Sequence, residues 1–326
     1  RRLVFEAALT PRLGDQRSLA AALEELGGPV RLREGDHAHV GDAAIVPARP
    51  ADTLARRFGD CKDLSLLLLG LLRAAGLQAR LALLSTDWHD LTAELPGLGE
   101  LDHVIVRVDG GPPLWLDVTD PSTPPGRLPP PIQGKLALVA GPGTRELVRL
   151  PASSPADNAA VTVRELHLAT VGRGRIVETR TLTGALADGE RRFRGEAGPD
   201  VDQRYALGIF RAETFLGADV KGADDPSAPL VVRVEADESA AVLTEDDEAD
   251  LPVTPDSIFQ PLLSVVPHGE AADAPPPAPR KTDLLLPLAY RWEVRYRIFP
   301  PDGFRPRPLP ESGTEKFGPA TYTRRF

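Results

Sequence analysis

The sequence predicts an α+β protein in which one apolar helix packs on an antiparallel sheet, followed by a mostly β domain. Three observations predict this class. Leucines dominate residues 60–75, which carry capping residues at both ends. Runs rich in β-branched residues, separated by glycine turns, follow this helix. Prolines then gather between residues 121 and 160, and strand-like alternation resumes beyond them.

The composition limits the classes of protein to consider. A chain of 326 residues is long enough for two domains. We expect a core with an N-terminal lead-in at residues 1–150 and a β-rich domain at 151–326. The 34 prolines and 29 glycines favour loops and strands over long helices. A net charge of -9 without a long Lys/Arg run argues against nucleic acid as a partner. Apolar stretches stay short of the ~20 residues that span a membrane.

The N-terminal residues and the cysteine content bear on whether the chain has been processed and in which compartment it works. The chain has no methionine and opens on Arg1 and Arg2, from which we expect a fragment or a processed product. Its single cysteine excludes an internal disulfide framework and a zinc site built from several cysteines. A lone thiol is compatible with both periplasm and cytoplasm, so the cysteine does not fix the compartment.

The first half is predicted to contain two early helical segments before the main helix. Residues 17–26 have helical spacing, 29–46 alternate weakly, and 50–58 form a short helix. For residues 60–75, Asp60 is the expected cap and Gly76 the stop. A turn is expected at 109–111, and the predicted strands are 78–85, 103–108, 114–118 and 135–140.

The second half has a different pattern. Residues 161–169 and 174–182 alternate, with a Gly-Arg-Gly turn between them, and predict a hairpin. Residues 189–194 and 200–215 favour helices. A loop rich in Pro and Ala is expected at 271–279, and further strands are expected at 230–236, 240–243 and 290–298.

The single cysteine stands at the start of the predicted main helix. A free cysteine has a pKa near ~8.5, so little of it is thiolate at neutral pH. A helix N-terminus favours the anion, a nearby histidine takes the proton, and a carboxylate fixes the tautomer of that histidine. His103 begins one predicted strand and Asp117 lies on its antiparallel neighbour. We therefore predict Cys61, His103 and Asp117 as the catalytic residues.

Four motifs occur in a recognisable order along residues 40–140. They are Gly-Asp-Cys-Lys-Asp at 59–63, Arg-Ala-Ala-Gly-Leu-Gln-Ala-Arg at 73–80, Asp-His-Val-Ile-Val at 102–106 and Trp-Leu-Asp-Val-Thr-Asp-Pro at 115–121. This arrangement resembles the transglutaminase-like superfamily of papain-type thiol enzymes. The Gly-Asp-Cys-Lys-Asp variant is similar to bacterial multidomain members with β-rich flanking domains of unknown function.

The resemblance implies a papain-like core and acyl transfer on peptide or carboxamide substrates. In it, Cys61 is the nucleophile, His103 the general base and acid, and Asp117 the orienting carboxylate. Hydrolysis, as in a protease or amidase, is expected rather than cross-linking. The backbone N–H of Cys61 is the expected oxyanion contributor. The resemblance also favours a periplasmic or extracellular location, implies no cofactor or metal, and suggests that a leading domain is missing. The oligomeric state stays open.

Other residues compete with this interpretation. Asp120 is the alternative to Asp117 as the carboxylate. His37 and His39 form a possible metal pair without an identifiable third ligand, and Trp88-His89 lies in a loop near the predicted cleft. The acidic run at 245–248 is interpreted as a solvated loop, because it matches no calcium-binding template.

Two functions of another class remain open. The chain could be a catalytically silent scaffold or binding module of the cell envelope that keeps this fold. Alternatively, residues 160–326 could carry the function as a β-rich adhesion or assembly module.

Overall fold

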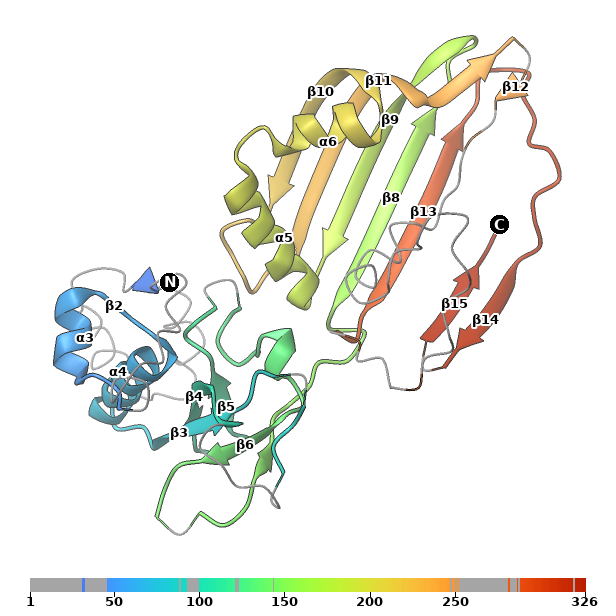
Figure 1. Cartoon of the computed structure of the whole chain (residues 1–326). Coiled ribbons are helices and arrows are strands. Elements are labelled where there is room, and N and C mark those ends of the chain that lie inside the picture. Colours follow the sequence, from blue (N-terminus) through green and yellow to red (C-terminus); the bar gives the residue numbers. More distant parts are fainter. Residues whose placement is uncertain are drawn as a thin grey trace.

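The structure, a computed structural model, has two large β-sheets, each with helices packed on it, and two further two-stranded pairs among its described residues (Figure 1). It describes residues 31–32, 46–87, 89–92, 100–120, 123–142, 144–246, 248–249, 251, 281, 286, 288–318 and 320–326. The first sheet is built from residues 79–149 and the second from residues 159–299. The chain passes from one to the other after β7, and Figure 1 shows the two sheets lying apart.

The first sheet has five antiparallel strands in the order β5-β4-β3-β6-β7. Helix α4 packs on β3 and β4, and a parallel pair of short strands precedes it. The elements of this half are β1 (Arg31–Leu32), α3 (Pro50–Arg56), β2 (Phe58–Gly59), α4 (Cys61–Ala74), β3 (Ala79–Leu84), β4 (His103–Val108), β5 (Leu114–Leu116), the 3-10 helix η3 (Pro130–Ile132), β6 (Leu136–Val139) and β7 (Val148–Arg149).

Helix α4 forms where the leucine pattern predicted a helix. The Asp60 side chain accepts a hydrogen bond from the backbone N–H of Asp63, which caps the first turn. At the other end, Gly76 has a positive φ of 80°, a conformation that glycine adopts without strain. Leu72 is 1% exposed and packs with Val106 and Leu116 of the sheet. Burying such a leucine stabilises the fold by roughly 1.5–3 kcal/mol.

The second sheet has the path β10-β11-β9-β8-β13, in which only the β8–β13 pair is parallel; β12 adds to β11. Figure 1 shows α5 and α6 on one face of this sheet. The elements are β8 (Ala159–His167), β9 (Gly172–Leu182), α5 (Gly184–Ala197), α6 (Val201–Ile209), β10 (Ala212–Lys221), β11 (Leu230–Glu245), β12 (Glu248–Ala249), β13 (Arg291–Phe299) and a separate hairpin, β14 (Gly313–Phe317) with β15 (Ala320–Arg324).

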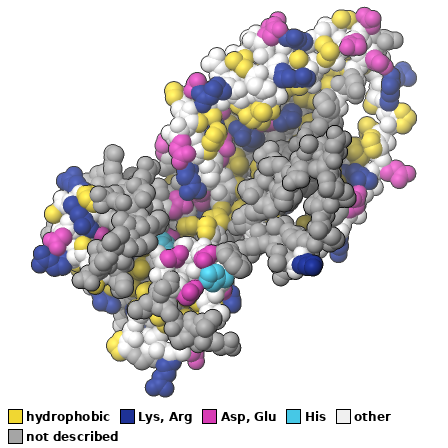
Figure 2. Space-filling model, viewed as in Figure 1, with side chains coloured by type: hydrophobic (Ala, Val, Ile, Leu, Met, Phe, Trp, Pro, Cys, Tyr) yellow, Lys and Arg dark blue, Asp and Glu magenta, His cyan; other side chains and the backbone are white. Residues whose placement is uncertain are grey.

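A hydrophobic core and one buried carboxylate join the helices to the second sheet. Ala187 of α5 and Ala206 of α6 pack against the strands. Glu178 is buried in β9, and its carboxylate accepts hydrogen bonds from Arg164 Nε at 2.8 Å and Tyr205 Oη at 2.8 Å. These partners offset the cost of burying the charge. On the face drawn in Figure 2, acidic and basic side chains are interspersed over this part of the molecule.

Three sequence predictions in the second half were wrong. The helix predicted over 200–215 ends at Ile209; Arg211 then has a φ of 49°, and the chain continues as β10. Pairing with β11 outweighs local helix propensity there. The strands predicted at 230–236 and 240–243 form one strand, β11, because a register shift after Ala236 lets pairing continue.

The third error concerns the turn between β8 and β9. Gly172 and Gly174 lie inside β9, and the turn falls at 168–171. A Cβ on Gly174 would stand 2.3 Å from the carbonyl oxygen of His167, so close backbone approach explains this glycine.

The described residues form a mixed helix and strand structure dominated by strands. In the described part of the chain, every helix is too short or too polar to cross a bilayer. The predicted helix at 17–26 and the predicted loop at 271–279 lie outside the described residues. A domain boundary near residue 150 and a papain-like core stay predictions.

Candidate active site

Cys61 is the first residue of α4, and its thiol is free and half-buried. The first backbone N–H groups of a helix have no partners within it, so they are available near the sulfur. The Sγ atom lies 4.0 Å from the carbonyl oxygen of Asp102, which immediately precedes β4. The start of the helix therefore meets the start of a central strand at this cysteine.

Asp63 holds the chain that leads into Cys61. Its side chain is buried, and it accepts a hydrogen bond from the backbone N–H of Ala48 at 2.8 Å and pairs with Arg56. Gly59 fits closely against it: a Cβ on Gly59 would stand 2.7 Å from the Cβ of Asp63. Lys62 pairs with Asp60. The position of Cys61 thus depends on a tight loop rather than on the helix alone.

Gly59→Ala is expected to lower the free energy of unfolding by about 1–3 kcal/mol, as overpacking of a close contact does. Chemical denaturation of both proteins measures this difference. Gly70→Ala is the matched control, because Gly70 is exposed in α4 and a Cβ there would stand 4.0 Å from the Cγ of Pro50, an ordinary van der Waals contact. Helix propensity predicts that this control gains up to ~1 kcal/mol. Equal effects of the two substitutions would refute the close-contact argument.

His103 is the first residue of β4 and pairs in register with Leu84 of β3. The preceding residue, Asp102, fixes this start: its carboxylate accepts hydrogen bonds from the backbone N–H of Thr86 at 2.7 Å and from Thr86 Oγ1 at 2.6 Å. Asp102 therefore ties the ends of two neighbouring strands together beside Cys61.

Asp117 directly follows β5 and meets the His103 ring, with 2.8 Å between Oδ2 and Nε2. Continuing the Val106–Leu116 register would put Asp117 opposite Ile105, so the His103 and Asp117 side chains meet diagonally. The other oxygen, Oδ1, accepts hydrogen bonds from the backbone N–H of Thr119 at 2.9 Å and from Thr119 Oγ1 at 2.6 Å. The Asp117 side chain is 2% exposed.

The charge state of His103 follows from these contacts. Burial of the ring disfavours its charged form, but the hydrogen bond with the Asp117 carboxylate and the charge of that carboxylate, together with the neighbouring Cys61, raise the pKa of His103 to about 10. Burial opposes ionisation of Asp117 as well, yet His103 and Thr119 hold the pKa of this carboxyl below its ordinary value. At neutral pH the ring is therefore an imidazolium between a buried carboxylate and a sulfur.

The structure brings Cys61, His103 and Asp117 together and directs Asp120 elsewhere. Asp120 accepts a hydrogen bond from Thr123 Oγ1 at 2.9 Å and pairs with Arg192 at 3.7 Å. Thr119 was not among the residues predicted from the sequence to belong to this site. The Asp-Val-Thr spacing, which is typical of an Asx turn, was the available signal.

The remaining candidates have other partners or fall outside the described residues. His37, His39 and Trp88 fall outside them. His89 pairs with Glu100 at 2.8 Å and with Asp87 at 3.3 Å. Among the described residues, no group of three or more His, Cys, Asp or Glu side chains is arranged to hold a metal ion. Within the acidic run at 245–248, Glu248 pairs with Arg307.

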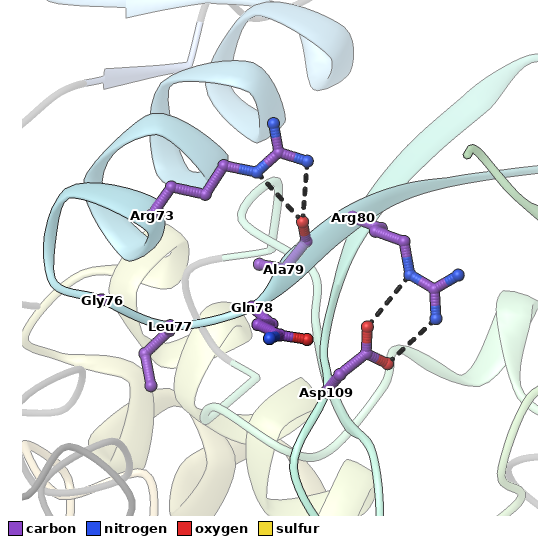
Figure 3. Close-up of a pocket in the computed structure, with 7 residues that line it drawn as sticks. All are labelled: Arg73, Gly76, Leu77, Gln78, Ala79, Arg80 and Asp109. Atoms are coloured by element: carbon purple, nitrogen blue, oxygen red, sulfur yellow. Dashed lines mark hydrogen bonds and ion pairs between the residues drawn. The ribbon is translucent and has the colours of Figure 1, made fainter. Parts of the chain in front are cut away.

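A cavity of about 500 Å³ lies at the other end of strands β3 and β4 (Figure 3). Arg80 donates hydrogen bonds to Asp109 there, at 3.0 and 3.1 Å, and Arg73 donates to the carbonyl oxygen of Ala79. Asp109 follows the last residue of β4, whereas His103 is its first. This cavity is therefore separate from the cysteine.

Comparisons with known proteins add little to this geometry. No protein-family model matches this sequence, and no curated protein matches it. A crystal structure described as "a putative protease" from Parabacteroides distasonis ATCC 8503 is similar over 78% of this chain, with 11% identity and a TM-score of 0.34. The match covers 51% of that chain, so this chain spans about half of its length. A TM-score this low carries no argument about shared fold or activity.

Proposed function

We propose that this protein is a cysteine-dependent acyl-transfer enzyme of the transglutaminase-like type, acting on peptide or carboxamide substrates. The observation that supports the proposal is the 2.8 Å contact of the His103 ring with the buried Asp117, at the point where Cys61 begins α4 next to the start of β4. A sulfur beside an imidazolium and a helix N-terminus is stabilised as a thiolate, the nucleophilic form of cysteine.

The proposed reaction has two halves. The Cys61 thiolate attacks the carbonyl carbon, and backbone N–H groups at the start of α4 stabilise the oxyanion that forms. The C–N bond breaks as His103 gives its proton to the departing amine, leaving a thioester on Cys61. Water then attacks the thioester while His103 takes up a proton, and the carboxylic acid leaves as Cys61 regains its charge. Asp117 keeps the ring oriented through both halves.

Hydrolysis is the proposed outcome, because the family resemblance favours a protease or amidase over cross-linking. A primary amine in place of water would give transamidation through the same thioester. Mass spectrometry of products formed with and without added amine distinguishes the two outcomes.

The thiol should react with iodoacetamide at pH 6 at least about tenfold faster than free cysteine, of which well under ~1% is thiolate at this pH. His103→Ala should abolish the difference, because the imidazolium that favours the thiolate is lost. The measurement is the alkylation rate of the whole chain from pH 5 to 9, followed by mass spectrometry.

His167→Ala is the matched control, since His167 stacks on Phe299 in the second sheet with 4.5 Å between ring centroids. It should leave the rate unchanged. A Cys61 thiol that reacts no faster than free cysteine, with no effect of His103→Ala, refutes the activated nucleophile. A fast-reacting thiol that never accumulates an acyl-enzyme with any amide or ester substrate supports the silent scaffold instead.

A further inference from the structure

Residues 117–120 and 123–128, the described parts of one segment, connect the candidate site to the second sheet. At its start, Asp117 contacts His103 and is held by Thr119. At its end, Leu128 is buried in the core of the first sheet, while the side chain of the preceding residue, Arg127, extends the other way, to α5. This segment is therefore held from two sides, by its own core and by a helix of the other sheet.

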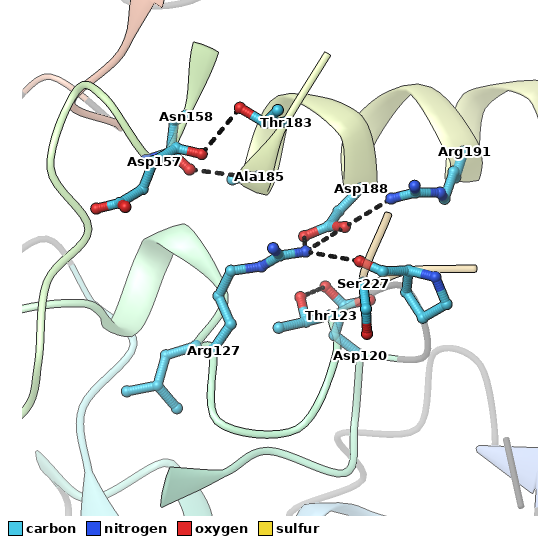
Figure 4. Close-up of polar contacts among 12 residues, drawn as sticks. Asp120, Thr123, Arg127, Asp157, Asn158, Thr183, Ala185, Asp188, Arg191 and Ser227 are labelled. Carbon is cyan, nitrogen blue, oxygen red and sulfur yellow. Dashed lines mark hydrogen bonds and ion pairs between the residues drawn. The ribbon is translucent and has the colours of Figure 1, made fainter. Parts of the chain in front are cut away.

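Arg127 contacts α5 through Asp188, a residue of that helix (Figure 4). Arg127 Nη2 donates to both carboxylate oxygens of Asp188, at 2.7 and 2.6 Å, and lies 3.4 Å from the carbonyl oxygen of Pro226. The Asp188 side chain is 5% exposed. Burial raises the pKa of Asp188 to about 6, although Arg127 and Arg191 oppose this, so the pair is ionised at neutral pH.

Other arginines of α5 reinforce the arrangement. Arg191 lies 3.3 Å from Asp188 and donates hydrogen bonds to the carbonyl oxygens of Gly222, Asp225 and Ala228. This fixes the loop that carries Pro226 beside Arg127. Arg192, one turn along α5 from Asp188, pairs with Asp120, which lies three residues after Asp117. Helix α5 thus holds the segment at two points, one of them close to the site.

Packing around Arg127 leaves room for movement. A cavity of about 400 Å³ lies beside this residue, lined by Leu128 and Gln133 of the first half and by Thr183 and Ser227 of the second. Densely packed contacts resist displacement, and a cavity does not. On the side that faces the second sheet, Arg127 is therefore held by its polar contacts with α5 rather than by dense packing.

We propose that Asp188 is a positioning residue for the Asp117 carboxylate, acting through Arg127, so that α5 of the second sheet forms part of the working site. The inference rests on the proposed function for its catalytic consequence. Its structural content, that α5 sets the orientation of Asp117 against His103, can be measured without turnover.

The test compares Arg127→Gln with Arg194→Gln in the full chain. Arg194 is the matched control: it lies on α5, is similarly buried and pairs with Asp202 of α6, away from the segment. NMR titration of His103 reports its contact with Asp117. We expect Arg127→Gln to lower the pKa of His103 and to reduce kcat by roughly 10- to 100-fold, as a displacement of about 1 Å does, with KM little changed. Arg194→Gln should change neither quantity.

Two further variants keep the proposal falsifiable. Arg127→Lys retains the charge and should restore part of the loss, and it carries the test if Arg127→Gln fails to fold. Asp188→Asn combined with Arg127→Gln should be no worse than the more damaging single substitution, because both act through one contact. A His103 titration that is the same in Arg127→Gln and in Arg194→Gln overturns the proposal. Absence of turnover in the unmodified protein refutes the proposed function alone, because the titration still decides the positioning.

Discussion

Cys61→Ala is expected to abolish acyl transfer, with kcat falling on the order of 10⁴- to 10⁶-fold, because no other group of the site can form the thioester. The residue is half-buried, and its Sγ lies 4.0 Å from the carbonyl oxygen of Asp102 and beside the His103 ring. Removing it should therefore leave the fold intact. Steady-state rates with a chromogenic amide or ester, and intact-mass detection of the acyl-enzyme, measure the loss.

Cys61→Ser separates the chemistry from the packing. It keeps a side chain of similar shape but replaces the thiolate by a hydroxyl, which is a far weaker nucleophile at neutral pH. Both variants should unfold at nearly the temperature of the unmodified protein. Turnover that survives Cys61→Ala would move the function away from this site, toward the β-rich residues 160–326.

The elements around Cys61 could be predicted because short-range patterns encode them. Asp60 caps α4 from within its own turn, and Gly76 ends it. The β-branched run from His103 to Val108 is a strand over that whole range. The exact side-chain pairing was harder to predict from the sequence. Asp117 contacts His103 diagonally across the strand pair, and Thr119 donates to the second carboxylate oxygen of Asp117. The catalytic roles of these residues stay predictions.

The elements and contacts that could not be predicted from the sequence depend on residues far apart in the chain. Ala212 to Phe215 continue a helical pattern, but their backbone groups pair with β11, a strand formed later in the chain. Arg127 and Asp188 lie 61 positions apart, and no local pattern marks either of them as the partner of the other. A long-range ion pair of this kind becomes visible only once both sheets are placed.

Asp117→Asn is expected to reduce kcat by about 10⁴-fold while leaving the backbone intact, as removal of the charge behind a catalytic histidine does. The amide is nearly isosteric with the carboxylate, but it cannot stabilise the imidazolium, and it can donate a hydrogen bond to the ring and so select the other tautomer. The pKa of His103, raised to about 10 by Asp117 and Cys61 in spite of burial, should fall. NMR titration of His103 measures this shift directly.

The same change should alter how stability depends on pH. Because the pKa of His103 is raised from 6.5 to about 10 in the folded state, its contribution is fully present below about pH 6.5 and is lost as pH rises through 10. The free energy of unfolding, measured by denaturation at several pH values between 6 and 10, should therefore fall less steeply with pH in Asp117→Asn than in the unmodified protein. Asp109→Asn is the matched control, since Asp109 lies at the other end of β4 and pairs with Arg80. If Asp109→Asn flattens the decline equally, the His103–Asp117 contact is not its source.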